Sequence, residues 1–222
     1  MTDELTRQEL LEALADRILA VERPHTVRVG VDGIDLAGKT TLADEMAAHI
    51  ERRGRPVIRA SIDGFHRPRV ERYRRGEDSP EGYYQDSFDY DSVREELLEQ
   101  LSPGGTGRYR AATFDLDSDV FIYEPLRDAS SGSILLFDGI FLFRPELNDF
   151  WDFRIFLHIG FDEMLRRARL RDTARFGTPE AVEQRYRTRY IPGQQLYLQS
   201  VEPEKLADVV VDNNDVARPR VV

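Results

Sequence analysis

The segment GIDLAGKTT, from Gly33 to Thr41, combines glycines, a lysine and threonines in a spacing that suits phosphate binding. It fits the pattern G-x-x-x-x-G-K-[ST] and stands between a valine-rich segment and apolar residues at helical spacing, which is the context this pattern requires. Glycines let backbone N–H groups turn toward phosphate oxygens, and the helix that follows adds the partial positive charge of its N-terminus. The sequence therefore predicts a nucleotide-binding P-loop consisting of Gly33, Ile34, Asp35, Leu36, Ala37, Gly38, Lys39, Thr40 and Thr41.

Three side chains in and near this loop carry the expected phosphate and metal chemistry. Lys39 and Lys205 are the only lysines among the 31 basic residues. A lysine ammonium follows a moving phosphate as a compact point charge, so Lys39 is expected at the β- and γ-phosphates of ATP. Thr40 is expected to bind Mg²⁺ through its hydroxyl. Asp138 ends an apolar run and precedes Gly139, as the acidic metal ligand of a P-loop protein does.

Asp63 is the candidate for the chemistry of phosphoryl transfer. A P-loop serves switch GTPases, motor ATPases and small-molecule kinases, and the guanine-reading pattern N-K-x-D is absent from this sequence. A kinase needs a carboxylate beside the hydroxyl that accepts the phosphoryl group. Asp63 ends the segment 57–63, the predicted strand after the P-loop helix, and a parallel sheet would bring it to the same edge as the phosphates. The alternative is an ordinary turn aspartate before Gly64.

Three segments, GIDLAGKTT, SIDGFHR and LLFDGIF, resemble in this order the uridine kinase and phosphoribulokinase family of P-loop kinases. The resemblance extends over about residues 26–213, and the S-x-D-x-F-[HY] segment is much more specific to this family than the P-loop is. It implies ATP- and Mg²⁺-dependent phosphoryl transfer to a hydroxyl of a small molecule, with the 5′-hydroxyl of uridine or cytidine as the leading acceptor. In this family Asp63 matches the general base.

The same resemblance implies an acceptor pocket made of residues from the segment 64–124. Phe65 and His66 belong to the S-x-D-x-F-[HY] segment, and Tyr83 takes the place of an acid that holds ribose hydroxyls. Phe114 replaces a tyrosine, and Asp119 replaces a histidine that contacts the base. Because these positions differ from those of uridine kinases, pantothenate, a different nucleoside and a sugar phosphate stay open as acceptors. The arginines that would suit a phosphorylated acceptor are Arg67, Arg69, Arg72, Arg74 and Arg75. A nucleotide-binding regulator is the alternative from another class of protein.

The segment RRARLRDTARFG resembles the lid of this family, which closes over ATP and places guanidinium groups on the transferring phosphoryl group. Arg171 is the first choice for this role, followed by Arg167 and Arg175. Arg167 and Arg171 are four residues apart and share a helix face. The alternative is a solvated helix whose charges pair with acidic neighbours. The segment 189–198 is expected either to border the acceptor pocket or to pack its tyrosines into the core.

These side chains need a framework of alternating strands and helices. Valine-rich or nearly continuous apolar segments predict strands at 26–32, 57–63, 134–143, 154–160 and 208–213. Helical spacing and capping signals predict helices at 3–22, 39–53, 92–101, 161–177 and 178–191, the first with a capping box from Thr6 to Glu9. Residues 64–90 are expected to form a long surface excursion and 104–124 a hairpin. The predicted fold is an α/β P-loop sandwich of three layers, with a mostly parallel central sheet, a helical lid and a small β-hairpin excursion.

The chain is expected to be a single kinase domain over residues 1–222, with an N-terminal helix in 1–24, an acceptor-binding excursion in 64–124 and a lid in 161–192. A net charge of −10 argues against broad nucleic-acid or membrane surfaces. The absence of cysteine excludes disulfides and thiolate zinc sites. No apolar run approaches the roughly 18 residues that span a bilayer. We expect a cytoplasmic enzyme whose partners are ATP and a small-molecule acceptor; the sequence leaves open whether it forms a homo-oligomer.

Overall fold

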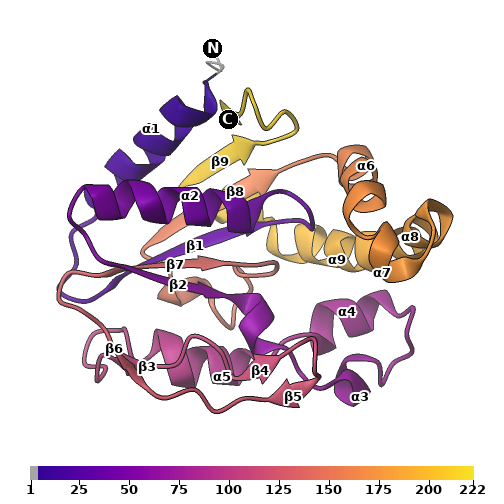
Figure 1. Cartoon of the computed structure of the whole chain (residues 1–222), viewed down its shortest axis with the longest axis horizontal. Coiled ribbons are helices and arrows are strands. Elements are labelled where there is room, and N and C mark those ends of the chain that lie inside the picture. The colour runs from indigo at the N-terminus through magenta and orange to yellow at the C-terminus, as the bar shows by residue number, and fades with distance from the viewer. Residues whose placement is uncertain (1–4) are drawn as a thin grey trace.

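The central sheet of the computed structural model, which describes residues 5–222, contains six strands in the order β10-β9-β8-β1-β7-β2 (Figure 1). These strands are β1 (Val27–Gly33), β2 (Val57–Ser61), β7 (Ile134–Asp138), β8 (Phe153–His158), β9 (Val209–Asp212) and β10 (Arg220–Val221). Neighbouring strands are parallel except β9 and β10. The predicted α/β fold with a mostly parallel sheet is confirmed. The short edge strand β10 was not predicted, because a segment of two residues carries no periodic signal.

Alternation along the strands divides the apolar core into two clusters, one on each face of the sheet. On β7, Ile134 and Leu136 pack in one cluster, whereas Leu135 and Phe137 pack in the other. The helices that contribute to the first cluster include α1 (Arg7–Leu19), α2 (Lys39–Arg52), α6 (Phe161–Arg171) and α8 (Pro179–Arg185). The helices that contribute to the second are α4 (Pro80–Asp86), α5 (Tyr90–Val93) and α9 (Ile191–Val201). Helices on both faces explain why every residue of β7 is buried.

The capping box predicted for the first helix is present. The N–H of Glu9 donates to Thr6 Oγ1 over 3.3 Å, and the N–H of Thr6 donates to Glu9 Oε2 over 2.8 Å. These bonds satisfy N–H groups that a helix start leaves without an intrahelical partner. The helix ends at Leu19, before the predicted end at residue 22. The predicted residues 3 and 4 lie outside the described part of the chain.

Residues 64–90 differ from the surface excursion that the sequence predicted. They follow β2 through the 3-10 turn η1 (Ile62–Phe65) and contain the helices α3 (Arg69–Arg72) and α4. Tyr84 and Phe88 are buried in the second cluster. The many charges of this segment suggested a solvated loop, but the aromatic side chains between them provide a face that the core can bury.

Several element boundaries also differ from the prediction. The predicted helix at 92–101 begins at Tyr90 and continues from α5 into a π-helical turn, η2 (Arg94–Leu98). The predicted strand at 134–143 ends at Asp138, and Phe141 beyond it has a φ of 68°. The run after Asp138 stays buried although it leaves the sheet, so apolar composition alone did not mark the strand end. A 3-10 turn, η3 (Asn148–Phe150), precedes β8.

The predicted hairpin forms on the side of the sheet that carries the excursion. Its strands β4 (Phe114–Asp115) and β5 (Val120–Phe121) pair antiparallel, and so do β3 (Arg108–Tyr109) and β6 (Arg127–Asp128) on either side of them in the chain. Both pairs are short and separate from the central sheet. The hairpin is therefore an appendage of the main fold, placed next to the short helices of the excursion (Figure 1).

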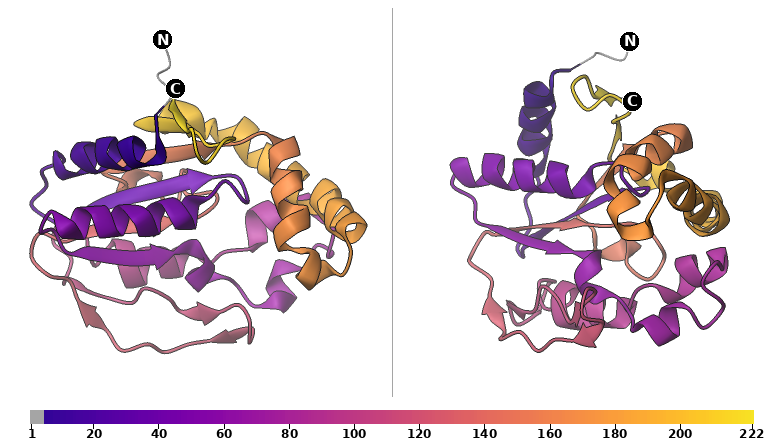
Figure 2. Two further views of the ribbon diagram at one scale, coloured as in Figure 1. Left: turned by 45° about the horizontal axis from the view of Figure 1, so that its top comes forward. Right: turned by 45° about the vertical axis from the view of Figure 1, so that its right-hand side comes forward.

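The predicted lid forms the helices α6, α7 (Thr173–Phe176) and α8 (Pro179–Arg185), followed by the π-helical turn η4 (Tyr186–Tyr190). Thr178 caps α8 by accepting a hydrogen bond from the N–H of Ala181 over 3.2 Å. The helices α9 and α10 (Pro203–Leu206) were not predicted. Pro192 lies in the first turn of α9, where proline is tolerated. Figure 2 shows these helices facing the short helices of the excursion at one edge of the sheet.

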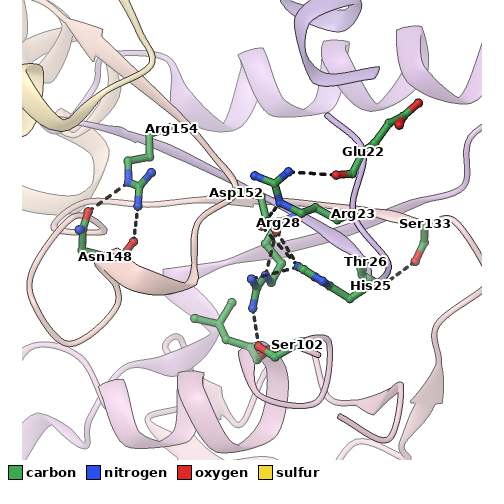
Figure 3. Close-up of polar contacts among 11 residues, drawn as sticks. Glu22, Arg23, His25, Thr26, Arg28, Ser102, Ser133, Asn148, Asp152 and Arg154 are labelled. Atoms are coloured by element: carbon green, nitrogen blue, oxygen red, sulfur yellow. Dashed lines mark hydrogen bonds and ion pairs between the residues drawn. The ribbon is translucent and has the colours of Figure 1, made fainter. Parts of the chain in front are cut away.

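A buried ionic cluster lies at the opposite edge, where β1 begins. Figure 3 shows Arg23, His25 and Arg28 converging on Asp152, which lies in the turn before β8. Arg28 Nε is 3.1 Å from Asp152 Oδ2, Arg23 Nε is 3.0 Å from Oδ1, and His25 Nε2 is 3.2 Å from Oδ2. Arg28 also donates to Ser102. These contacts join β1 to two distant segments of the chain. Within residues 5–222 no helix is both long and apolar enough to cross a membrane.

Candidate active site

The P-loop connects the end of β1 to the start of α2. Gly33 has a φ of 152°, and a Cβ there would lie 2.5 Å from the carbonyl oxygen of Leu157. Gly38, with a φ of 93°, immediately precedes α2. Both positions therefore require glycine. Lys39 Nζ donates to the carbonyl oxygen of Ile34 over 2.8 Å, so the loop curves around the ammonium group.

Thr40 and Asp138 meet at the rim of this loop. Thr40 Oγ1 donates to Asp138 Oδ2 over 2.6 Å, and Ser61 Oγ lies 3.4 Å from the same oxygen. Asp138 is the last residue of β7 and pairs in register with Ser61 of β2. Arg59 Nη2, which the sequence gave no reason to single out, is 2.8 Å from Asp138 Oδ1. It holds the buried carboxylate with one oxygen directed toward Thr40.

This set of oxygen atoms fits a magnesium ion bound together with nucleotide. Mg²⁺ prefers oxygen ligands and usually takes only one or two carboxylates from the protein, completing its shell with water and phosphate. Thr40 and Asp138 supply a hydroxyl and a carboxylate. Over the described residues, no group of three or more histidines and acids could hold a metal without such help.

A cavity of about 410 Å³ extends from the P-loop between the excursion and the lid. The sequence-predicted site residues that line it are Asp35, Leu36, Gly38, Lys39, Thr40, Thr41, Asp63, His66, Tyr83, Asp138, Arg171 and Arg175. These residues come from segments as far apart in the chain as α2 and α7. The cavity therefore places phosphate-binding residues and candidate acceptor residues around one space.

Asp63 is an open carboxylate on the wall of this cavity, with a side chain that is 72% exposed. The sequence predicted that Asp63 ends the strand. It lies instead in η1, two residues beyond the end of β2. His66 Nδ1 lies 3.0 Å from the carbonyl oxygen of Asp63 and 4.0 Å from its carboxylate. The His66 ring packs on Phe88 with a centroid distance of 4.5 Å, and burial lowers the pKa of His66. His66 therefore supports the turn that presents Asp63.

Three residues predicted to bind the acceptor lie outside this cavity. Phe65 is fully buried against Phe137, and Phe114 packs on Phe121 within the hairpin. Both side chains are buried and serve packing, Phe65 from the turn η1 and Phe114 from the strand β4. Asp119 accepts from the N–H of Arg69 over 3.0 Å and pairs with Arg72 Nη2 at 2.7 Å.

Asp119 instead lines a second, more open cavity of about 800 Å³ beside α3 and α8. Arg72 and Arg175 line both cavities. The acid at position 119 thus organises α3 and one arginine of the main cavity, and it does not face the P-loop side.

The lid arginines divide into two groups. Arg171 and Arg175 line the cavity. Arg171 Nε pairs with Asp172 Oδ1 at 2.6 Å, and because Asp172 is buried, this ion pair fixes the position of Arg171. Arg167 does not line the cavity. Its guanidinium donates to the carbonyl oxygens of Leu36 over 3.0 Å and Asn213 over 2.7 Å. Arg167 was predicted to contact the transferring group. In the structure it contacts the backbone of the P-loop instead.

The segment 189–198 does both things that the sequence allowed. Tyr190 lines the cavity, whereas Tyr197 is buried in the core and donates to Asp32. Gln194, which was not predicted, is fully buried and accepts from the N–H of Asp35 over 2.6 Å. The adjacent glutamines Gln194 and Gln195 are the signal in the sequence that could have pointed to this contact.

Comparison with known proteins adds relatives over most of the chain. No known protein-family model matches. Uridine-cytidine kinase B of Dictyostelium discoideum is 29% identical over 189 residues, which cover 84% of this chain and 74% of that protein. Uridine-cytidine kinase A of the same organism is 28% identical over 188 residues. These residues cover 35% of the length of that protein. The chain is thus similar to uridine-cytidine kinases over most of its length, and these relatives indicate a small-molecule kinase.

Solved structures share the fold of this kinase. The "Possible Uridine Kinase from Bacillus stearothermophilus" superposes with a TM-score of 0.73 at 24% identity, covering 91% of this chain and 97% of that one. D-glycerate 3-kinase from Cryptococcus neoformans superposes with a TM-score of 0.60 at 13% identity, covering 84% and 88%. The fold is thus common to kinases with different acceptors. The relatives identify a small-molecule kinase, for which the kinase family implies ATP as the donor.

Proposed function

We propose that this kinase transfers the γ-phosphoryl group of ATP to the 5′-hydroxyl of a nucleoside, uridine or cytidine. The observation that carries the proposal is the single cavity in which the open carboxylate of Asp63 faces the P-loop residues Lys39 and Thr40. A hydroxyl bound beside Asp63 would lie next to the phosphates that the loop holds. The similarity to uridine-cytidine kinases supports a nucleoside as the molecule that carries this hydroxyl.

The phosphate side of the cavity would act by positioning and by neutralising charge. Lys39 and N–H groups of the loop would bind the β- and γ-phosphates, and Thr40 and Asp138 would hold Mg²⁺. When bound, Mg²⁺ neutralises negative charge on the phosphate oxygens. Arg171 and Arg175 at the rim add positive charge next to the transferring group and help to exclude water.

The acceptor side would supply the proton acceptor. Asp63 takes the proton of the attacking hydroxyl as the bond to phosphorus forms, and ADP leaves on the opposite side. His66 keeps the turn of Asp63 in place through the backbone carbonyl, since its ring is fixed against Phe88. Among the described residues, the nearest basic group to the Asp63 carboxylate is His66 Nδ1, at 4.0 Å.

The arginines of the excursion favour an uncharged acceptor over a phosphorylated one. Arg74 and Arg75 both bind Asp86, Arg72 binds Asp119, and Arg67 donates to the carbonyl oxygen of Phe88 over 3.0 Å. Of the five arginines in this segment, Arg72 alone lines the main cavity. Because Arg72 is paired with Asp119, the excursion directs no unpaired guanidinium group of its described residues into the cavity, where a sugar phosphate would need one.

A panel of acceptors tests this function. Uridine, cytidine, purine nucleosides, pantothenate and sugar phosphates are each mixed with ATP–Mg²⁺, and the release of ADP is followed. We expect uridine or cytidine to raise ADP release well above the rate without acceptor, and Lys39→Ala to lower that rate by roughly 10²-fold or more. A panel in which pantothenate or a sugar phosphate is the best acceptor would contradict the nucleoside assignment.

A further inference from the structure

Asp35 belongs to the phosphate-binding loop, yet both of its polar groups contact the acceptor side of the molecule. Its N–H donates to Gln194 Oε1 of α9 over 2.6 Å, so this N–H is not directed at a phosphate. Its carboxylate accepts a hydrogen bond from Tyr83 Oη of α4 over 2.9 Å. Gln194 is itself held, because its amide donates to the carbonyl oxygen of Tyr190 over 2.9 Å. Asp35 is thus fixed by two helices outside the P-loop.

The surroundings of Asp35 are unfavourable for a carboxylate without a function. Burial raises the pKa of Asp35, the positive charge of Lys39 opposes this, and the nearby negative charge of Asp63 adds to it. An anion in a loop that binds phosphates also repels them. Asp35 and Asp63 line the same cavity, so two carboxylates from different segments border the space in which an acceptor would bind.

We propose that Asp35 and Tyr83 form an acceptor-recognition pair, in which Asp35 accepts a hydrogen bond from a second hydroxyl of the acceptor. The acceptor would be a neutral molecule with neighbouring hydroxyl groups, such as the ribose of a nucleoside. This inference rests on the proposed kinase function and deepens it by naming residues that select the acceptor.

The chemistry of the pair favours this class. An ionised carboxylate only accepts hydrogen bonds, so it binds O–H groups and does not bind the oxygens of a phosphate or carboxylate group. The Tyr83 hydroxyl donates to Asp35 and keeps lone pairs that can accept from a substrate hydroxyl. With Asp63 at the reacting hydroxyl and Asp35 at a neighbouring one, an anionic acceptor would face two like charges. A site built in this way rejects an analogue that lacks the second hydroxyl.

The packing of Tyr83 allows the pair to be tested without removing a side chain from the core. Its ring contacts Phe141 and Tyr190 with centroid distances of 5.4 and 4.8 Å. Tyr83→Phe keeps this ring and removes only the hydroxyl, and Asp35→Asn keeps the shape of the side chain and removes the charge. The matched control is Tyr84→Phe, since Tyr84 is the next residue of α4 and its hydroxyl contacts Ser200 outside the cavity.

The experiment compares kcat and KM for uridine, 2′-deoxyuridine and 3′-deoxyuridine in the full chain and these variants, with ATP–Mg²⁺. The affinity for a non-hydrolysable ATP analogue is measured by calorimetry. We expect the parent protein to prefer uridine over at least one deoxy analogue by roughly tenfold or more in kcat/KM. Asp35→Asn and Tyr83→Phe should raise KM for uridine and narrow that preference, while the ATP analogue binds as tightly as before or more tightly. Tyr84→Phe should change neither the KM for uridine nor the preference for uridine over the deoxy analogues.

Two results would overturn the inference while the nucleoside kinase stands: an unchanged preference in Asp35→Asn, or a loss confined to binding of the ATP analogue. If a neutral polyol other than a nucleoside is the best acceptor, the nucleoside assignment fails, and a raised KM for that polyol in Asp35→Asn supports the pair. If the best acceptor carries a phosphate or carboxylate, the inference and the nucleoside assignment both fail.

Discussion

The negative charge of Asp63 should be needed for phosphoryl transfer but not for the binding of ATP. Asp63→Asn keeps the size of the side chain but cannot take a proton, so kcat should fall by roughly 10²- to 10⁴-fold while ATP binds with little change. Initial rates with uridine and calorimetry with ATP measure the two effects. Asp91→Asn is a matched control because Asp91 is also 72% exposed and lies on α5, away from the cavity. A value of kcat in Asp63→Asn close to that of the control would rule out Asp63 as the general base.

Asp32 should make the stability of the protein depend on pH. It is fully buried below the P-loop, where it accepts from Tyr197 and from the N–H of Gly33, and burial raises its pKa from 3.8 to about 6. The folded state then holds this proton at pH values where the unfolded state has lost it. The free energy of unfolding should therefore fall by about 3 kcal/mol as the pH rises from about 4 to above 6.

Urea denaturation of the parent protein and of Asp32→Asn at several pH values measures this contribution. Asparagine retains an acceptor for Gly33 and has no charge to bury, so the variant should gain stability relative to the parent as the pH rises through this window. Other carboxylates titrate in both proteins and cancel in the difference. A difference that stays constant between pH 4 and pH 7 would show that Asp32 is ionised in the folded state over the whole range.

At the scale of elements, the ionic cluster around Asp152 fixes where β1 begins. Asp152→Ala would leave the buried guanidinium of Arg28 without its carboxylate, and breaking a buried ion pair from one side costs roughly 3–5 kcal/mol. Urea denaturation should show this loss, with Asp149→Ala as the control because Asp149 is exposed and three residues away. A loss no larger than that of the control would mean that solvent replaces the carboxylate.

The pairing of Asp152 also has a pH dependence of known sign. Although burial of Asp152 works against the charged form, its hydrogen bonds with Arg28 hold its pKa below the usual value. The stability from this cluster is therefore present at neutral pH and is lost as the pH falls through the lowered pKa. Its sign is opposite to that of Asp32, so the two ends of β1 respond to acid in opposite directions.

Local patterns explain which elements could be predicted from the sequence. The P-loop, the buried strands and the capped starts of α1 and α8 each depend on neighbouring residues, and these agree with the structure to within a few positions. The irregular parts could not be predicted in the same way. The π-helical turns η2 and η4 have helical composition, and the buried turn after Asp138 has the composition of a strand.

At the scale of the whole molecule, the candidate site depends on contacts between segments that are far apart in the chain. The predicted site residues Lys39, Asp63 and Tyr83 line one cavity, whereas Phe114 and Asp119, which were expected beside them, lie outside it. Whether a side chain faces the cavity depends on how α4, α9 and the hairpin pack on the sheet. That packing follows from the two core clusters as a whole, so no short segment encodes it.

Arg167 has a mechanical consequence for the whole kinase. Its guanidinium ties α6 to the turn at Leu36 and to the chain beyond β9 at Asn213, while Nε binds Glu163 within the same helix. The near end of the lid is therefore fastened to the loop that grips the nucleotide. A tilt of α6 would pull on that loop, and a loop reshaped by nucleotide would push on α6. Through Arg167, a movement of the lid and a change in the shape of the P-loop are therefore mechanically coupled.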